Sequence, residues 1–154
     1  MIVEALLKKP QRVGRVTMYS PNGTQEALSF FYNKLCYETD PADVYADVQD
    51  GEPDFVVIDA RSHESYLREH VPGAINMPHK EMNMISTANL PKEKLMVVYC
   101  DGIGCNASTK GSAKLISLGF RAKEMMGGID WWKRDGYPVE TGETNHNGIS
   151  CGCE

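Results

Sequence analysis

A cysteine followed by a loop of small residues is the feature of this 154-residue sequence best suited to chemistry. The segment "VVYCDGIGCNAS", residues 97–108, places Cys100 directly after an apolar run, with Gly102 and Gly104 close behind it. Backbone N–H groups in such a loop can converge into an anion-binding nest, and a helix that starts after it adds a positive dipole. Both effects stabilise the thiolate, which is the nucleophilic form of cysteine. The segment therefore predicts a reactive thiol.

Other interpretations of Cys100 and of its neighbour Cys105 stay open. Cys100 is also explained as a small apolar residue that ends a strand, with glycines that only make a turn. Cys105 is also open to two interpretations, as a small buried loop residue or as a second reactive thiol. In the second case the two thiols would act as a pair.

The other cysteines and the histidines give weaker signals. Cys36, in "NKLCYET", is expected to be an inert buried thiol among strand-like residues. Cys151 and Cys153 form "CGC" in a polar tail, where a passive role is favoured over a metal or redox role, since one Cys-x-Cys pair cannot complete a zinc shell. No histidine has a metal-ligand spacing, so no metal or cofactor is predicted; the four are His63, His70, His79 and His146. His79 is either a residue of the pocket mouth or an exposed turn residue.

The elements that must position Cys100 follow from an alternation of strand and helix patterns. Continuous apolar runs at 55–58 and 95–99 are typical of buried parallel strands, and a third short strand is expected at 122–126. Asp40 and Ser62 are placed to cap two helices, and Gly119 to end a third. The pattern predicts an α/β domain with a central, mainly parallel sheet, whose ligands bind beyond the carboxyl ends of the strands. Cys100 lies at such an end.

Composition narrows the class of protein. The chain is 42% hydrophobic, which fits one globular domain, and its net charge of −5 favours neither nucleic acid nor an anionic membrane as a partner. No run is long enough for a membrane span, and the N-terminal charges do not match a secretory signal. Cytoplasmic location is expected. The basic residues Lys8, Lys9, Arg12 and Arg15 form either a solvated arm or a partner-binding one.

Three separate segments resemble the rhodanese family of sulfurtransferases. "VVIDARSHESYLREHVPGAINMP" resembles the signature that follows the family's strand, "VVYC" with its loop resembles the active-site segment, and "MMGGIDWWKRDGYPVE" resembles the closing segment. The likeness runs from about residue 37 to 141. It implies a three-layer sandwich with a parallel sheet flanked by helices over 36–142. Before it, turn residues and the spacing of Ala27, Phe30, Phe31 and Leu35 predict an amphipathic helix, so that an arm and a helix packed on the domain are expected over 1–35. A Gly/Cys-rich tail follows over 143–154.

The resemblance also implies a reaction. In rhodaneses a loop cysteine takes a sulfane sulfur from a donor, holds it as a persulfide among backbone amides, and passes it to a nucleophilic acceptor. By position Cys100 is that nucleophile, with a small-molecule or protein sulfur donor and acceptor as partners. Asp59 and Arg61 are expected to frame the pocket. The backbone amides that hold the persulfide are implied to come from the loop residues Asp101, Gly102, Ile103, Gly104, Cys105 and Asn106.

Departures from the family pattern refine this prediction. The loop carries acidic Asp101 and has no Lys or Arg before Lys110, so thiosulfate is expected to be a weak donor. Phosphatases of the same fold need an arginine six residues after the cysteine, where this chain has Asn106, so phosphate ester hydrolysis is not expected. A dithiol redox enzyme and a non-catalytic binding or regulatory module remain the alternatives.

Overall fold

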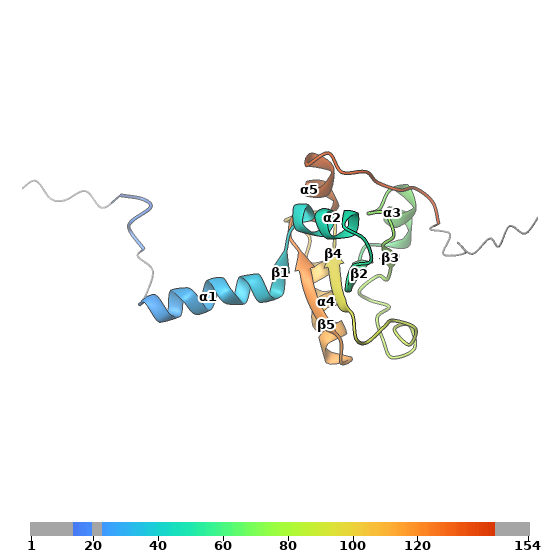
Figure 1. Ribbon diagram of the computed structural model, residues 1–154, viewed down its shortest axis with the longest axis horizontal. Helices are drawn as coiled ribbons and strands as arrows, with labels where there is room; N and C mark the ends of the chain where they lie inside the picture. The colour runs from blue at the N-terminus through green and yellow to red at the C-terminus, as the bar shows by residue number, and fades with distance from the viewer. Residues whose placement is uncertain (1–13, 20–22, 144–154) are drawn as a thin grey trace, which may run out of the picture. The chain divides into compact units, whose positions relative to one another are not determined.

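The computed structural model describes residues 14–19 and 23–143. Within these residues five strands form a single sheet in the order β1-β5-β4-β2-β3, and every neighbouring pair is parallel (Figure 1). The strands are β1 (Glu38–Thr39), β2 (Phe55–Asp59), β3 (Ile75–Asn76), β4 (Leu95–Tyr99) and β5 (Arg121–Met125). The predicted α/β class with a parallel sheet is confirmed. All three strands predicted from the sequence are present.

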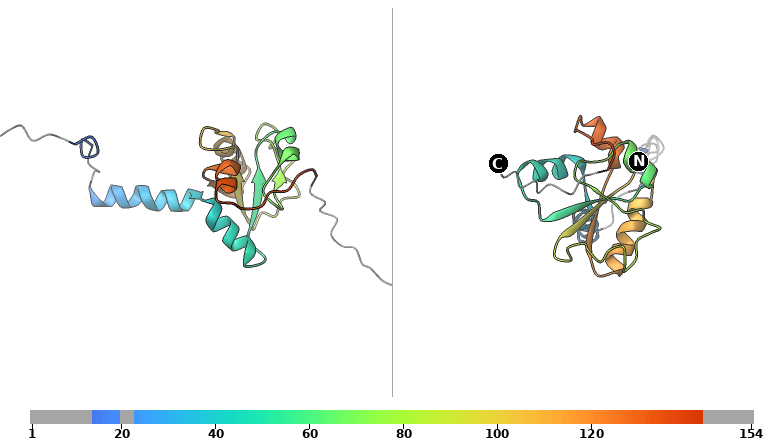
Figure 2. Two further views of the ribbon diagram at one scale, coloured as in Figure 1. Left: turned by 90° about the horizontal axis from the view of Figure 1, so that it is seen from above. Right: turned by 90° about the vertical axis from the view of Figure 1, so that its right-hand side faces the viewer.

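Helices cover both faces of this sheet, so the domain has three layers (Figure 2). They are α2 (Pro41–Gln49), α3 (His63–Arg68), α4 (Ala107–Ser117) and α5 (Gly128–Arg134). Alternate residues of β4 point to opposite faces, as the pleat requires. Val97 and Tyr99 join the apolar cluster that contains residues of α2 and α5, whereas Met96 and Val98 join the one that contains Leu115 of α4. Burial on both faces explains the continuous apolar sequence of β4.

The helix ends form where local sequence chemistry predicts them. The Asp40 side chain accepts a hydrogen bond from the Asp43 amide at 2.9 Å, and Ser62 accepts one from the Ser65 amide. Gly119 follows α4 with a φ of +88°, a conformation that glycine adopts without steric cost. These caps fix the first residues of α2 and α3 and the last residues of α4.

The N-terminal part of the chain forms a separate unit. Contacts divide the chain into Met1–Lys34 and Leu35–Glu154. Helix α1 (Thr24–Tyr37) confirms the predicted helix, but none of its residues is buried, and its packing on the domain stays a prediction. The expectation for Cys36 was wrong: this residue lies in α1 rather than among strand residues, and its thiol is exposed. Cys151, Cys153, His146 and most of the basic arm lie outside the described residues.

Candidate active site

Cys100 follows the last residue of β4, the central strand of the sheet. Its backbone carbonyl accepts a hydrogen bond from the Ile129 amide at 3.0 Å, and the Asp101 carbonyl accepts one from the Asp130 amide at 2.9 Å. The start of α5 therefore holds the start of the loop. Gly128, with a φ of +56°, lies so close that a Cβ there would collide with the Cys100 carbonyl. This contact accounts for the second glycine of the "MMGG" segment.

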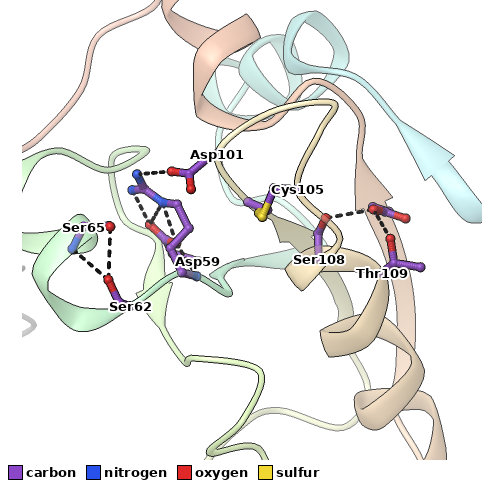
Figure 3. Close-up of a disulfide and its surroundings, with 10 residues drawn as sticks. Asp59, Ser62, Ser65, Asp101, Cys105, Ser108 and Thr109 are labelled. Carbon is purple, nitrogen blue, oxygen red and sulfur yellow. Dashed lines mark hydrogen bonds and ion pairs between the residues drawn. A yellow bond between two sulfur atoms is a disulfide. The ribbon is translucent and has the colours of Figure 1, made fainter.

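The loop returns toward the strand end, and Cys105 forms a disulfide with Cys100 (Figure 3). The two Cα atoms are 6.2 Å apart, and the Cys105 amide donates to the Gly102 carbonyl at 3.1 Å. Cys100 is only 2% exposed, whereas Cys105 is half-buried. Cys105 is thus the more accessible residue of the pair. The sulfur of Cys105 reaches that of the predicted nucleophile, as the dithiol interpretation requires.

Most backbone amides of this loop have no hydrogen-bond acceptor among the described residues. The Cys105 amide is used within the loop, and no described residue accepts a hydrogen bond from the amides of Asp101, Gly102, Ile103, Gly104 and Asn106. Asn106 precedes α4 without a side-chain cap, so the first amides of that helix are also without a capping side chain. Unpaired donors at a helix start favour negative charge nearby. Their convergence on the Cys100 sulfur remains a prediction.

A buried ion pair lies beside the loop. The Arg61 guanidinium binds both carboxylate oxygens of Asp59, with Nε–Oδ1 at 3.0 Å and Nη2–Oδ2 at 2.7 Å. Its remaining donors reach the Glu69 carbonyl at 2.6 Å and the Asp101 carboxylate at 3.3 Å. Asp59 is fully buried and Arg61 is 7% exposed. Arg61 therefore connects the end of β2 to a loop residue 40 positions away, a contact that sequence reasoning did not predict (Figure 3).

Tyr99, the last residue of β4, completes this network. Its hydroxyl donates to Asp59 Oδ2 at 2.5 Å and accepts from the Val71 amide at 3.1 Å. Burial raises the pKa of Tyr99, and the neighbouring Asp59 carboxylate raises it further, so the phenol stays protonated. Burial alone would lower the pKa of Arg61, but the hydrogen bond and charge of Asp59 outweigh that effect and raise it. The network therefore holds Arg61 and Asp59 in place beside the loop.

Replacing Tyr99 with phenylalanine should lower the free energy of unfolding by about 1–2 kcal/mol, because it leaves the Asp59 carboxylate one donor short and the Val71 amide unpaired. Urea unfolding of both proteins measures the change. Tyr37→Phe is the control, since Tyr37 is exposed and should change stability by less than about 0.5 kcal/mol. Equal stability of the Tyr99→Phe and wild-type proteins would contradict the role given to this hydroxyl.

A cavity of about 410 Å³ lies next to the loop. Arg61 and Cys105 line it, as do residues of α3 and of the turn at 78–81; the full lining is Ala60, Arg61, Ser62, His63, Ser65, Pro78, His79, Lys80, Glu81, Asp101, Cys105 and Ala107. His79 is thus at the pocket, as one interpretation of the sequence had it. Lys80 was not predicted, because it comes from a turn that carries no motif. A second, more open hollow lies on the other side of the loop, where Gly102, Ile103 and Gly104 line it.

The disulfide also bears on metal binding. Among the described residues, ligand atoms of Cys100, Asp101 and Cys105 lie within 4.8 Å of one another. Both sulfurs are joined in the disulfide, and the Asp101 carboxylate faces Arg61. We assign no metal to this group.

Comparisons with known proteins agree with this architecture. The Rhodanese-like domain family matches residues 40–135. The BH2092 protein of Bacillus halodurans has a similar structure, with a TM-score of 0.75 and 41% identity over 77% of this chain and 87% of that one. Thiosulfate sulfurtransferase PspE of Escherichia coli K12 is 40% identical over 75 residues, which are 47% of this chain and 68% of PspE.

This chain spans only a small part of some longer relatives. The tRNA sulfurtransferase of Desulfurococcus amylolyticus is 36% identical over 76 residues, which are 49% of this chain but 14% of that protein. In the part of this chain that the structure describes, no helix is both long and apolar enough to cross a membrane. The fold, the strand-end cysteine and the family match over residues 40–135 together show that the chain belongs to the rhodanese-like domain family.

Proposed function

We propose that this protein is a cysteine-dependent sulfurtransferase in which Cys100 carries the sulfur. The observation that carries the proposal is the place of Cys100, at the carboxyl end of the central strand and at the start of a loop that leads into α4. Relatives named as sulfurtransferases support the same reaction class. A cytoplasmic location, with no nucleic acid or membrane as partner, belongs to the same proposal.

The reaction begins from the reduced protein. The Cys100 thiolate attacks the sulfane sulfur of a donor, a new S–S bond forms to Cys100, and the donor's own S–S bond breaks with its electron pair leaving on the departing group. An acceptor nucleophile then attacks the outer sulfur, and Cys100 leaves as the thiolate. Loop amides and the start of α4 stabilise the negative charge on sulfur in both states. No general base is needed once the thiol is ionised.

The disulfide favours a second outcome for the same intermediate. The Cys105 thiolate attacks the Cys100 sulfur of the persulfide, the bond between the two cysteines forms, and the outer sulfur leaves as hydrosulfide. The product of this step is the Cys100–Cys105 disulfide that the structure contains. In this route the protein acts as a dithiol that reduces sulfane sulfur. It needs a thiol reductant before the next cycle.

Thiosulfate remains the weaker donor in this proposal, and a protein or low-molecular-weight persulfide the better one. Asp101 is not the whole reason, because Arg61 pairs with its carboxylate. The limited access of a donor to Cys100 is the stronger reason. Cys100 lines neither of the two hollows beside the loop, so a donor must reach a covered sulfur.

Mass spectrometry of the reduced protein after donor treatment tests the proposal. Wild-type protein should lose two hydrogen atoms, because Cys105 resolves the persulfide, whereas Cys105→Ser should gain one sulfur atom on Cys100. Cys36→Ser is the matched control and should behave as wild type, since Cys36 is an exposed thiol in α1. Absence of added sulfur in Cys105→Ser with every donor would favour the non-catalytic module. Faster reaction with thiosulfate than with a persulfide would contradict the donor preference.

A further inference from the structure

The two sulfurs of the disulfide differ in how a reductant can reach them. Thiol–disulfide exchange requires the attacking sulfur to approach one of the two sulfurs directly. Cys100 is 2% exposed and lines no described cavity. Cys105 is half-buried and lines the 410 Å³ cavity as well as the more open hollow. An external thiol therefore meets Cys105 first.

The stability of the leaving thiolate also favours attack at the Cys105 sulfur. Attack at Cys105 expels Cys100 as the thiolate, and a thiol with a lower pKa leaves faster. Under the proposed function, the loop amides and the start of α4 stabilise the Cys100 thiolate more than that of Cys105. Attack at Cys100 would instead expel Cys105, the residue nearer the solvent. Access and leaving-group stability thus both favour attack at Cys105.

The cavity beside Cys105 has a positive side. Lys80 lines it, and the Lys114 ammonium donates to the His79 carbonyl at 2.7 Å. Burial lowers the pKa of His79, and the neighbouring charges of Lys110, Lys114 and Lys80 lower it further. The nearby negative charges are Asp101, which faces Arg61, Glu143, which pairs with His63 at 3.2 Å, and the exposed Glu81.

We propose that this cavity binds an anionic low-molecular-weight thiol, whose sulfur attacks Cys105 and opens the disulfide. The thiolate forms a mixed disulfide with Cys105, the bond between the two cysteines breaks, and its electron pair leaves on Cys100 as the thiolate. A second molecule of the thiol then attacks the mixed disulfide, releases its oxidised dimer and restores the Cys105 thiol. Two thiols are oxidised and one protein disulfide is reduced. The inference rests on the proposed function for the role of the freed Cys100.

The test uses the oxidised full-length protein and no sulfur donor, so it can fail while sulfur transfer stands. The protein is mixed with 2-mercaptoethanesulfonate, an anionic thiol, quenched in acid and alkylated with N-ethylmaleimide. Fragmentation of the tryptic peptide 95–110, which holds both cysteines, then locates the adducts. We expect the mercaptoethanesulfonate on Cys105 and the maleimide on Cys100. The reverse pattern would overturn the assignment of the attacked sulfur.

A charge-reversal pair tests the binding site. Lys80→Glu should slow opening by mercaptoethanesulfonate about threefold to tenfold and leave opening by neutral 2-mercaptoethanol unchanged. Lys92→Glu makes the same change in charge and serves as the control. Lys92 lies before β4, at the opposite end of that strand from Cys100, and lines a different hollow. It should affect neither rate. Equal rates for Lys80→Glu and Lys92→Glu with the anionic thiol, or an equal effect of Lys80→Glu on both thiols, would overturn the proposed site.

Discussion

Replacing Cys100 with serine should reduce sulfur transfer by about a thousandfold or more, because a hydroxyl at this position is neither ionised at neutral pH nor able to form a persulfide. The measurement is steady-state transfer from a persulfide donor to a thiol acceptor under reducing conditions. Serine is close in size to cysteine, so the strand end should keep its packing. The loss should therefore appear in turnover and not in the fold.

Cys105→Ser is the matched control for this experiment. Either variant removes the same disulfide, which closes a short loop and contributes about 2 kcal/mol, so both should lose the same stability in the oxidised state. Only Cys100→Ser should lose transfer to an external acceptor. If Cys105→Ser lost transfer and Cys100→Ser kept it, the nucleophile would be Cys105, and the proposed order of attack would be wrong.

Gly128→Ala should lower the free energy of unfolding by about 3–5 kcal/mol and abolish transfer. Part of this cost, about 1–2 kcal/mol, comes from a side chain at a φ of +56°. The rest comes from the collision of the new Cβ with the Cys100 carbonyl and the Asp101 backbone, which must move apart. The collision also breaks the contact by which α5 holds the start of the loop. Thermal unfolding and the transfer assay measure the two effects.

Gly136→Ala separates the two causes. Gly136 lies just beyond the other end of α5 with a φ of +82°, and a Cβ there would meet nothing within 4 Å. This variant should lose only the conformational part, about 1–2 kcal/mol, and keep its activity. A similar loss in both variants would mean that the close approach to Cys100 has no energetic role.

Local patterns predicted most of the fold. The apolar runs of β2 and β4 are continuous because both faces of the sheet are covered, and the caps at Asp40 and Ser62 depend on residues only three positions away. The position of Cys100 at a strand end followed from the same patterns. Such features are encoded over a few residues, which is why the sequence was sufficient for them.

The contacts around the site depend on distant segments and were only partly predictable. Asp101 reads as an isolated acid in the sequence, but Arg61 faces it from the end of β2, and this pairing changes the expected charge at the loop. Tyr99 reads as one more apolar strand residue, although its hydroxyl completes the Asp59 site. A polar atom at the end of an otherwise apolar strand was the available signal. Cys36 was misplaced because its neighbours suit a strand; Glu38–Thr39 do form β1, but α1 extends through Cys36 and ends at Tyr37.

The shortness of the two outer strands has a consequence for behaviour at high concentration. β1 and β3 are two residues long each, so each border of the parallel sheet offers few backbone groups to another polypeptide. Long open borders are templates on which molecules add to one another and precipitate. With a net charge of −5 adding mutual repulsion, the folded domain is expected to resist fibril-like association.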